Sequence, residues 1–384
     1  MYKRQLLENS ELEEYRDNHM SYYQAFAARC DEQLTGTSEA LAWQALDNEW
    51  ANIRTAYDAT VEKRDFEKAA EILLSLGWYS LYSVRWEVFA KALQLLRVPG
   101  VERLTRYADL CGMAAIDCYI TVHPDALKWA EKGLQASKQS PSKFCRTVLL
   151  GVLTNNQLDS KRAETVTKEW LAEVQESESP DLQEWIWAHG FRAFHLCTER
   201  RPAEAIPLCE KLLNHARWSG SASATAVACW AHGMTQLIDG IDSANAVWDD
   251  GVGWAQSLYG GHLLTHMIVG LQLHVSAGRG ELPQVTTLCR KALLAAKEQH
   301  YLAGTSHLFG VTAIVLSRNN DTDTAARLLG AMVANGHTPR SNAIGFLHKL
   351  LGDRLEAKMS AGAHLSISNA ADIALQHLDQ YIEA

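Results

Sequence analysis

Apolar side chains recur along almost the whole chain at intervals of three and four residues, the spacing that places them on one face of an α-helix. The segment ALKWAEKGL is typical, because Leu127, Ala130 and Leu134 fall on one stripe while Lys128 and Lys132 fall outside it. Runs in which apolar and polar residues alternate, the pattern of a half-buried strand, are nearly absent. The pattern therefore predicts an all-α protein of roughly eighteen helices joined by turns of a few residues.

The turns between the predicted helices are regularly spaced, with about 36 to 42 residues between successive hairpins. Helices that follow these turns begin near Pro124, Ser160, Pro202, Ser243, Glu281 and Thr322. Such a period, filled by two antiparallel helices, is typical of α-solenoids, in which each hairpin buries its apolar face on the next. The residue pattern of strict tetratricopeptide repeats is not kept. We therefore predict a right-handed α-solenoid of degenerate tetratricopeptide-like helical hairpins.

The same pattern divides the chain into four segments. Residues 1–5 precede any helical periodicity, residues 6–98 form an N-terminal helical block, and residues 99–338 carry the repeats. In residues 339–384 the period weakens, and two longer helices around a Gly/Ser break are expected. A terminal repeat has to cover the last apolar face of an array, so this segment is predicted to be a helical C-terminal cap.

Composition and charge exclude several classes of protein. The 384 residues carry a net charge of −9 without a basic cluster, so direct binding to nucleic acid is not expected. No apolar run reaches the roughly 20 residues of a membrane span, and no secretory signal opens the chain. The eight cysteines are scattered without a Cys-x-x-Cys pair, which is typical of reduced thiols. We expect a cytoplasmic protein that does not contact a membrane.

Catalytic and cofactor motifs are mostly missing from the sequence. It contains no phosphate-binding Gly-x-x-x-x-Gly-Lys-Ser/Thr loop and no nucleophile elbow. His262 and His266 are four residues apart on one helix face, a spacing that can hold zinc, but no general-base glutamate or third ligand accompanies them. We interpret them as partly exposed histidines of a groove-lining helix. The sequence thus predicts a non-enzyme without cofactor or metal, and an unrecognised helical active site is the weaker alternative.

The aromatic residues allow two interpretations. Trp187 and Trp230, with Arg192 nearby, fall on predicted helices of neighbouring repeats. Twelve tryptophans in an all-α array mostly fill the space between helices, which is the first interpretation. The second is that a few of them line a concave groove, where aromatic and arginine side chains commonly anchor a ligand. The candidate groove residues are Trp187, Arg192, Trp230, His262 and His266.

One block near the start, residues 19–73, carries a more specific pattern. Its ordered positions are His19, Tyr22, Tyr23, Leu34, Gly36, Trp43, Leu46, Glu49, Asn52, Ile53, Arg54, Ala56, Asp65, Ala69 and Ala70. The block resembles the start of the helical-repeat region that follows the nucleotide-binding module in bacterial STAND-type signalling ATPases. These include class III adenylate or guanylate cyclases with an ATPase and repeats, LuxR-type regulators and antibiotic-regulatory proteins. ARLLGAM, residues 326–332, resembles the way such chains close, whereas Arg64 stands where the family often has glycine.

The resemblance implies a function. The chain would be the non-catalytic sensor or interaction region of a signal-transduction ATPase, a fragment whose ATPase and cyclase or transcription output lie upstream. Its partner would be a protein or peptide, or the missing ATPase module in cis. The alternative is a freestanding adaptor that binds one partner protein in its concave groove.

Three polar residues of the block lie beside core positions. On a helix Glu49 and Asn52 share one face, while Arg54 points toward Trp50 and Asp58. We expect Arg54 to stack on Trp50 and to pair with Asp58, and Asn52 to bind a neighbouring turn. Both roles are structural and need no ligand.

The first five residues, MYKRQ, have an interpretation of their own. Read from a GTG start, the bases GTG-TAT-AAG-AGA-CAG encode them and match the end of a common transposon-based sequencing adaptor. We therefore expect a library scar on a truncated reading frame, which has no part in the fold. An ordinary frayed N-terminus is the alternative.

Overall fold

The structure is a computed structural model that describes residues 11–137, 143–155, 160–176, 181–258, 261–279, 282–337 and 341–383. The expected scar at residues 1–5 and the predicted helix-start residue Glu281 lie outside these ranges. Within them the chain forms helices and no strand, which confirms the predicted all-α class. None of the described helices combines the length and apolar character needed to cross a bilayer.

The described ranges hold 21 α-helices, against the roughly eighteen predicted. The first part contains α2 (Glu11–Gln33), α3 (Glu39–Asn48), α4 (Trp50–Glu62), α5 (Phe66–Ser75), α6 (Gly77–Tyr82), α7 (Glu87–Leu95) and the 3-10 turn η1 (Val101–Arg103). The middle part contains α8 (Tyr107–Ile120), α9 (Ala126–Ser137), α10 (Lys143–Asn155), α11 (Ser160–Glu176), α12 (Leu182–Thr198), α13 (Pro202–Ser219), α14 (Ala222–Gln236), α15 (Ile241–Ser257), α16 (His262–Arg279), α17 (Leu282–Glu298), α18 (Leu302–Arg318) and α19 (Thr322–Ala334). The last part contains α20 (Ser341–Leu351), α21 (Arg354–Ser360) and α22 (Ile367–Glu383).

Local capping chemistry sets several of the helix starts. Asp181, Ser221 and Asp321 each accept a hydrogen bond from a backbone N–H in the first turn of the helix that follows. Pro202 opens α13, where a missing backbone N–H costs no helical hydrogen bond. The predicted helix starts near Pro202 and Thr322 are therefore confirmed by α13 and α19.

The turn between α4 and α5 explains the glycine expected from the resemblance. Arg64 has a φ of 59°, in the left-handed region that glycine adopts most easily. The backbone N–H groups of Arg64 and Asp65 donate to carbonyl oxygens in the last turn of α4. The turn thus has the geometry that glycine normally provides, although this chain carries arginine there.

From α8 to α18 the helices alternate between an inner and an outer layer. The inner helices α8, α10, α12, α14, α16 and α18 each pack on the next inner helix, and the outer helices α9, α11, α13, α15 and α17 pack on their inner neighbours. Inner helices such as α8, α12, α14 and α18 are buried at most positions, whereas outer helices such as α13 and α15 bury one stripe. The periodicity explains this division, because a helix that is apolar on all sides has to be enclosed.

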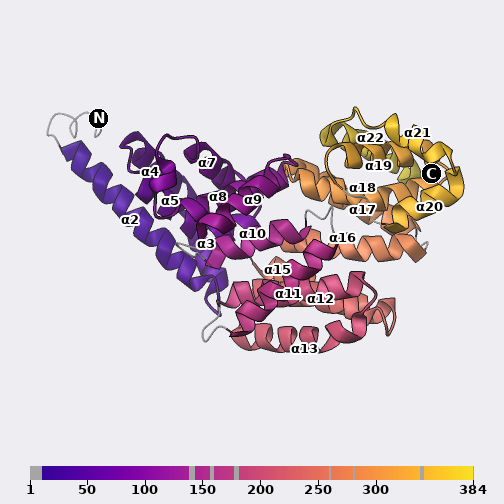
Figure 1. The fold of residues 1–384 in the computed structure, drawn as a ribbon, viewed down its shortest axis with the longest axis horizontal. Coiled ribbons are helices and arrows are strands. Elements are labelled where there is room, and N and C mark those ends of the chain that lie inside the picture. The colour runs from indigo at the N-terminus through magenta and orange to yellow at the C-terminus, as the bar shows by residue number, and fades with distance from the viewer. Residues whose placement is uncertain are drawn as a thin grey trace.

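The array curls so that its first and last parts meet (Figure 1). Helix α6 contacts α16, and α8 contacts α18, although these pairs are far apart in the sequence. Trp86, in the turn after α6, donates its indole N–H to the carbonyl oxygen of Gln299 at 3.0 Å. Its ring centre also lies 5.4 Å from that of Tyr301, just before α18. This seam joins the N-terminal block to the C-terminal part of the array.

A second contact joins the N-terminal block to the middle of the array. The carboxylate of Glu39, at the start of α3, accepts hydrogen bonds from the Ser221 hydroxyl at 2.9 Å and the Ser223 backbone N–H at 3.1 Å. The Glu39 side chain is only 2% exposed, and its pKa is raised because burial disfavours the charged form, while these hydrogen bonds partly offset that effect. The first helices therefore contact both the middle and the end of the array.

Glu49 connects α2 to α4. The Tyr23 hydroxyl on α2 donates to Glu49 Oε2 at 2.7 Å, and the Asn52 side-chain amide donates to the same oxygen at 2.7 Å. Asn52 therefore binds Glu49 rather than a neighbouring turn. Asn52 has a structural role, as expected, but its partner is the carboxylate of Glu49, three residues earlier on the chain.

The prediction that Arg54 stacks on Trp50 and pairs with Asp58 is wrong. Arg54 Nε lies 3.7 Å from Glu87 Oε2 on α7, and Asp58 pairs instead with a lysine of α7. The cation over Trp50 is Arg85, whose guanidinium carbon lies 4.5 Å from the indole ring centre. These partners come from α7 and the turn before it, so spacing along α4 alone could not identify them.

The buried apolar residues form two clusters. The larger extends from α2 to α16 and includes the start of α18, and the smaller extends from the end of α16 to α22. The larger cluster continues across the predicted boundary between residues 98 and 99, and the smaller continues across that between 338 and 339. The segment boundaries drawn from the sequence pattern therefore stay predictions.

The C-terminal cap contains three helices, where two longer ones were expected. Gly352 ends α20 with a φ of 55°, and α21 begins two residues later. Helix α22 packs on α17, α18 and α19 and so covers the end of the array. Gly330 of α19 lies so close to the end of α21 that a Cβ there would overlap the carbonyl oxygen of Met359.

Candidate binding cavity

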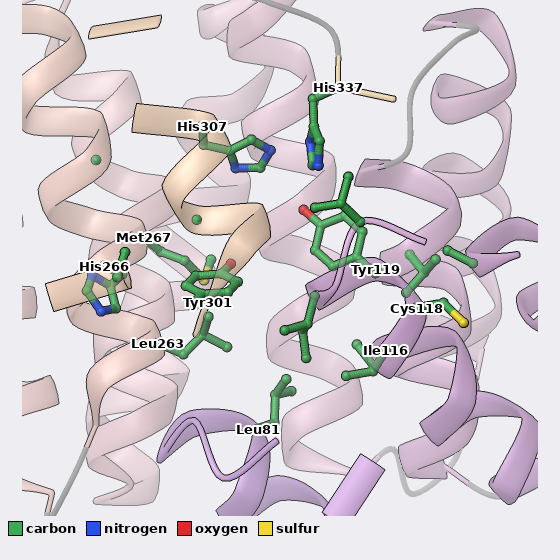
Figure 2. A pocket seen from close by; sticks show the side chains of 18 of the residues that line it. Leu81, Ile116, Cys118, Tyr119, Leu263, His266, Met267, Tyr301, His307 and His337 are labelled. Carbon is green, nitrogen blue, oxygen red and sulfur yellow. The ribbon is translucent and has the colours of Figure 1, made fainter. Parts of the chain in front are cut away.

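A cavity of about 1230 Å³ lies within the curl of the array. The inner helices from α8 to α18 form most of its wall, and residues of α6, α9, α17 and the turn after α19 complete it. Figure 2 shows side chains from the first and last parts of the chain facing one another across it.

Aromatic side chains form one wall of the cavity. Trp187, Phe191 and Phe194 project from α12, and Trp230 projects from α14. The rings of Phe194 and Trp230 stack with their centres 4.8 Å apart, and those of Trp187 and Phe191 with their centres 5.2 Å apart. The indole N–H of Trp187 donates to the Tyr82 hydroxyl at 2.8 Å, which fixes the orientation of this ring. This wall is therefore aromatic, and a hydrogen bond orients one of its rings.

A second wall comes from α16 and the start of α18. His266 Nε2 lies 2.7 Å from the side-chain oxygen of Gln299, and the His266 ring centre is 6.0 Å from that of Tyr301. Met267 lies beside them in the wall (Figure 2). Burial lowers the pKa of His266, and the bond to Gln299 only partly offsets this, so the ring is neutral at pH 7.

One end of the cavity is polar. His307 of α18 and His337, after α19, meet edge to face with ring centres 5.3 Å apart. The hydroxyl end of Tyr119, on α8, points toward this pair (Figure 2). Burial raises the pKa of Tyr119 to about 12 and lowers the pKa of His337 to about 4, so both side chains are neutral at pH 7.

The described lining of the cavity contains no aspartate, glutamate, lysine or arginine. It combines aromatic, aliphatic and sulfur-containing side chains with a few histidine, threonine and asparagine groups. The cavity therefore offers apolar surface and hydrogen-bonding groups, and the only titratable nitrogen groups in its described lining are histidines.

The cavity includes some of the predicted groove residues but not all of them. Trp187, Trp230 and His266 lie in its wall. Trp187 and Trp230 are each 5% exposed, so they fill space between helices and also line the cavity. His262 is exposed and lies outside the wall, one helical turn before His266. Arg192 also lies outside it, buried near a carboxylate of α11 at 3.9 Å.

Sequence reasoning missed Tyr119, His307 and His337. Tyr119 lies on α8 and His307 on α18, and these helices become neighbours only because the array curls. No local spacing links the three positions, so the sequence carries no short motif that could have found them.

Within the described ranges, no group of three or more His, Cys, Asp or Glu side chains is placed to hold a metal ion. His266 faces Gln299, and His262 is exposed to solvent. Neither observation supports a shared zinc site at this pair, whose spacing alone made zinc worth considering.

The sequence was compared with known protein families and with curated proteins. A scan against models of known protein families finds no match, and no curated protein matches the sequence. Function therefore has to be inferred from the sequence pattern and from the cavity.

His189, behind the aromatic wall, makes the fold sensitive to acid. Its ring is fully buried, stacks on Trp185 with ring centres 3.8 Å apart, and has Nδ1 2.9 Å from the Trp185 carbonyl oxygen. Burial lowers the pKa of His189 to about 4. The unfolded chain, with a histidine pKa of about 6.5, therefore binds the proton first, and stability falls as the pH drops from about 6.5 toward 4.

We expect this one histidine to remove about 2.5 kcal/mol of stability between pH 7 and pH 4.5. Urea unfolding of the unmodified chain and of His189→Phe at both pH values measures the effect. The phenyl ring keeps the stack on Trp185 but takes up no proton, so the variant should lose less stability on acidification. Equal losses in the two proteins would show that His189 is not held neutral.

Proposed function

We propose that the chain is a non-catalytic sensor region of a bacterial STAND-type signalling ATPase. In this proposal the helices from α8 to α18 form a right-handed α-solenoid of degenerate tetratricopeptide-like hairpins, with a post-ATPase helical block before them and a cap after them. The ATPase, and an output in cyclic-nucleotide synthesis or transcription, belong to other domains of a longer chain. The protein acts in the cytoplasm, and the array receives the signal.

The cavity is the observation that carries this proposal. Its wall combines α8 and α10 with α16 and α18, so a bound molecule contacts distant parts of the chain at once. A molecule that binds only this arrangement of the helices stabilises it by about 2.7 kcal/mol when its concentration is 100 times its Kd. A sensor needs this kind of bias between two states, because a ligand shifts an equilibrium only through its different affinities for them.

The block that carries the resemblance gives further support. Its apolar positions Trp43, Leu46 and Ile53 are at most 1% exposed. Gly330, in the closing segment ARLLGAM, lies at a close backbone contact between α19 and the end of α21. These apolar residues and this glycine thus lie at tightly packed positions. A fold shared with the resembled family would need the same residue types there.

Sequencing the source DNA upstream of codon 6, from a library prepared without the adaptor, tests this proposal. We expect an in-frame nucleotide-binding module with a P-loop, followed by a winged helix. A stop codon and a ribosome-binding site directly upstream would contradict the proposal and leave the chain as a protein in its own right.

A freestanding adaptor is the second candidate. The sequence pattern predicts its partner in the concave groove, whereas the one surface observation that favours an adaptor lies on the outer helices. Trp218, at the end of α13, is 84% exposed, and Trp254 of α15 is 38% exposed. Exposed tryptophans are frequent anchors of protein interfaces. Under this alternative, Trp218→Ala abolishes capture of a partner protein, whereas a sensor that works through the cavity retains its ligand affinity.

A further inference from the structure

We propose that the cavity binds a small, uncharged and largely apolar molecule that carries a hydrogen-bonding group at one end. The aromatic wall holds the apolar body, and the polar end formed by Tyr119, His307 and His337 holds the hydrogen-bonding group. The biological role of this ligand rests on the sensor function proposed above, whereas the site rests on the geometry of the cavity.

The lining decides the charge of the ligand. A carboxylate, phosphate or ammonium group that leaves water needs an opposite charge or several strong hydrogen bonds, and without them its transfer costs several kcal/mol. The described wall contains no aspartate, glutamate, lysine or arginine. His266 and His337 do not compensate, because burial lowers the pKa of each and keeps the rings neutral. An uncharged ligand enters without this cost.

The volume of the cavity and its aromatic wall indicate the size and the apolar character of the ligand. Pockets for drug-sized molecules usually have roughly 300–1000 Å³, and the cavity, at about 1230 Å³, has room for such a molecule. The stacked pair of Phe194 and Trp230 offers a flat apolar surface on which an aromatic or alicyclic body can lie. Leu263 and Met267 on α16 add further apolar side chains to the lining (Figure 2).

The polar end decides where the hydrogen-bonding group lies. A tyrosine hydroxyl and a neutral imidazole each contain one donor and at least one acceptor. Tyr119 points toward His307 and His337 across the cavity (Figure 2). A hydroxyl, carbonyl or amide of the ligand can therefore bind there. The rest of the wall is more apolar than polar, although Thr147, Thr198 and His266 also line it, so we expect the polar group of the ligand to lie at this end.

An extended peptide fits this lining less well. Every peptide residue brings a backbone N–H and C=O that need partners once they leave water. The described wall gathers a tyrosine and two histidines at one end, and much of the rest is aromatic or aliphatic. A peptide would leave most of its backbone groups unpaired, whereas a small molecule with one polar group would not.

Two fluorescent probes with the same aromatic skeleton test the charge preference on the unmodified chain. N-phenyl-1-naphthylamine is neutral, and 8-anilinonaphthalene-1-sulfonate is the same arylamine with a sulfonate. We expect saturable binding of the neutral probe to one site, and binding of the sulfonate at least about tenfold weaker. No binding of the neutral probe, or equal affinity for both, would overturn the proposal.

A filled cavity tests the location. Gly270 lies in the wall on α16, and a Cβ built there meets no atom within 4 Å, so we expect the ring of Gly270→Phe to occupy cavity space. Gly253→Phe is the matched control, since Gly253 also lies inside a helix with open space around it but outside the wall. We expect at least about tenfold loss of neutral-probe affinity in Gly270→Phe and no loss in the control. Equal affinity in a folded Gly270→Phe variant would place the site elsewhere.

Displacement of the neutral probe tests the polar end. Decan-1-ol and decanoate share an alkyl chain and differ in the charge of the head group. We expect decan-1-ol to displace the probe at a concentration at least about tenfold lower than decanoate. His337→Phe should weaken decan-1-ol at least about threefold more than it weakens the probe. Displacement by decanoate as strong as that by decan-1-ol would overturn the proposal.

The failures of the two proposals can be told apart. If the upstream DNA encodes no ATPase while the neutral probe binds as expected, the cavity is a ligand site in a protein of another kind. If an ATPase is present and the neutral probe does not bind, the sensor receives a different signal and the proposed ligand class is wrong.

Discussion

Gly330→Ala is expected to lower the free energy of unfolding by about 3 kcal/mol. A Cβ at this position would overlap the carbonyl oxygen of Met359, and backbone cannot move aside as the end of a flexible side chain can. Helix α19 and the end of α21 would have to separate, and the cap would lose part of its packing on α19. Denaturant unfolding monitored by circular dichroism measures the change.

Gly345→Ala is the control for this experiment, and its effect should have the opposite sign. Gly345 lies inside α20, where an added Cβ meets no atom within 4 Å. Alanine is better than glycine in a helix by about 1 kcal/mol, so this variant should be slightly more stable than the unmodified chain. Equal effects of the two substitutions would mean that α19 and α21 do not meet at Gly330.

Glu39→Ala is expected to lower the free energy of unfolding by about 3 kcal/mol. The substitution leaves the Ser221 hydroxyl and the Ser223 backbone N–H without their carboxylate acceptor and empties a buried site between α3 and α14. Glu39→Gln keeps an acceptor oxygen of the same reach, so it should cost about 1 kcal/mol. Comparing the two variants therefore shows how much of the loss in stability comes from the missing hydrogen bonds and how much from the missing charge.

Glu32→Ala provides the comparison for this second result. Glu32 lies near the end of α2 and is exposed, so its replacement should change stability by no more than about 0.5 kcal/mol. Urea unfolding of the three variants gives the values. If Glu39→Ala is as mild as Glu32→Ala, the N-terminal block is not held against α14 by this carboxylate.

Helix starts were predictable where a few neighbouring residues determine them. Asp321 caps α19 and Pro202 opens α13, and both signals can be recognised without knowledge of any distant contact. The all-α class follows in the same way from the spacing of apolar residues. The cap was predicted less well, because Gly352 breaks its first predicted helix into α20 and α21 through a left-handed turn.

Contacts between distant helices were not predictable from local spacing. Periodicity lists the residues that share a helix face, but it does not identify the helix opposite. Arg54 therefore has its partner on α7 rather than on its own helix. Trp86 bonds to Gln299, 213 residues away, because the packing of α6 on α16 brings the two parts of the chain together.

The candidate site was predictable only in part for the same reason. Trp187 and Trp230 lie on neighbouring inner helices, so an aromatic groove could be foreseen from their repeat positions. His266 could be foreseen as a lining residue, but nothing in its sequence surroundings distinguishes it from the exposed His262. Tyr119 joins the site only through the closure of the array.

Photolabelling with benzophenone tests most directly the central claim that the array curls around a cavity for uncharged molecules. Benzophenone is neutral and aromatic, carries one carbonyl acceptor, and inserts on irradiation into nearby C–H bonds, with a preference for methionine. We expect labelled peptides from α16, foremost at Met267, and also from α8, with labelling prevented by N-phenyl-1-naphthylamine and by Gly270→Phe. Labels confined to exposed positions such as Trp218, and unaffected by the competing probe, would contradict the account.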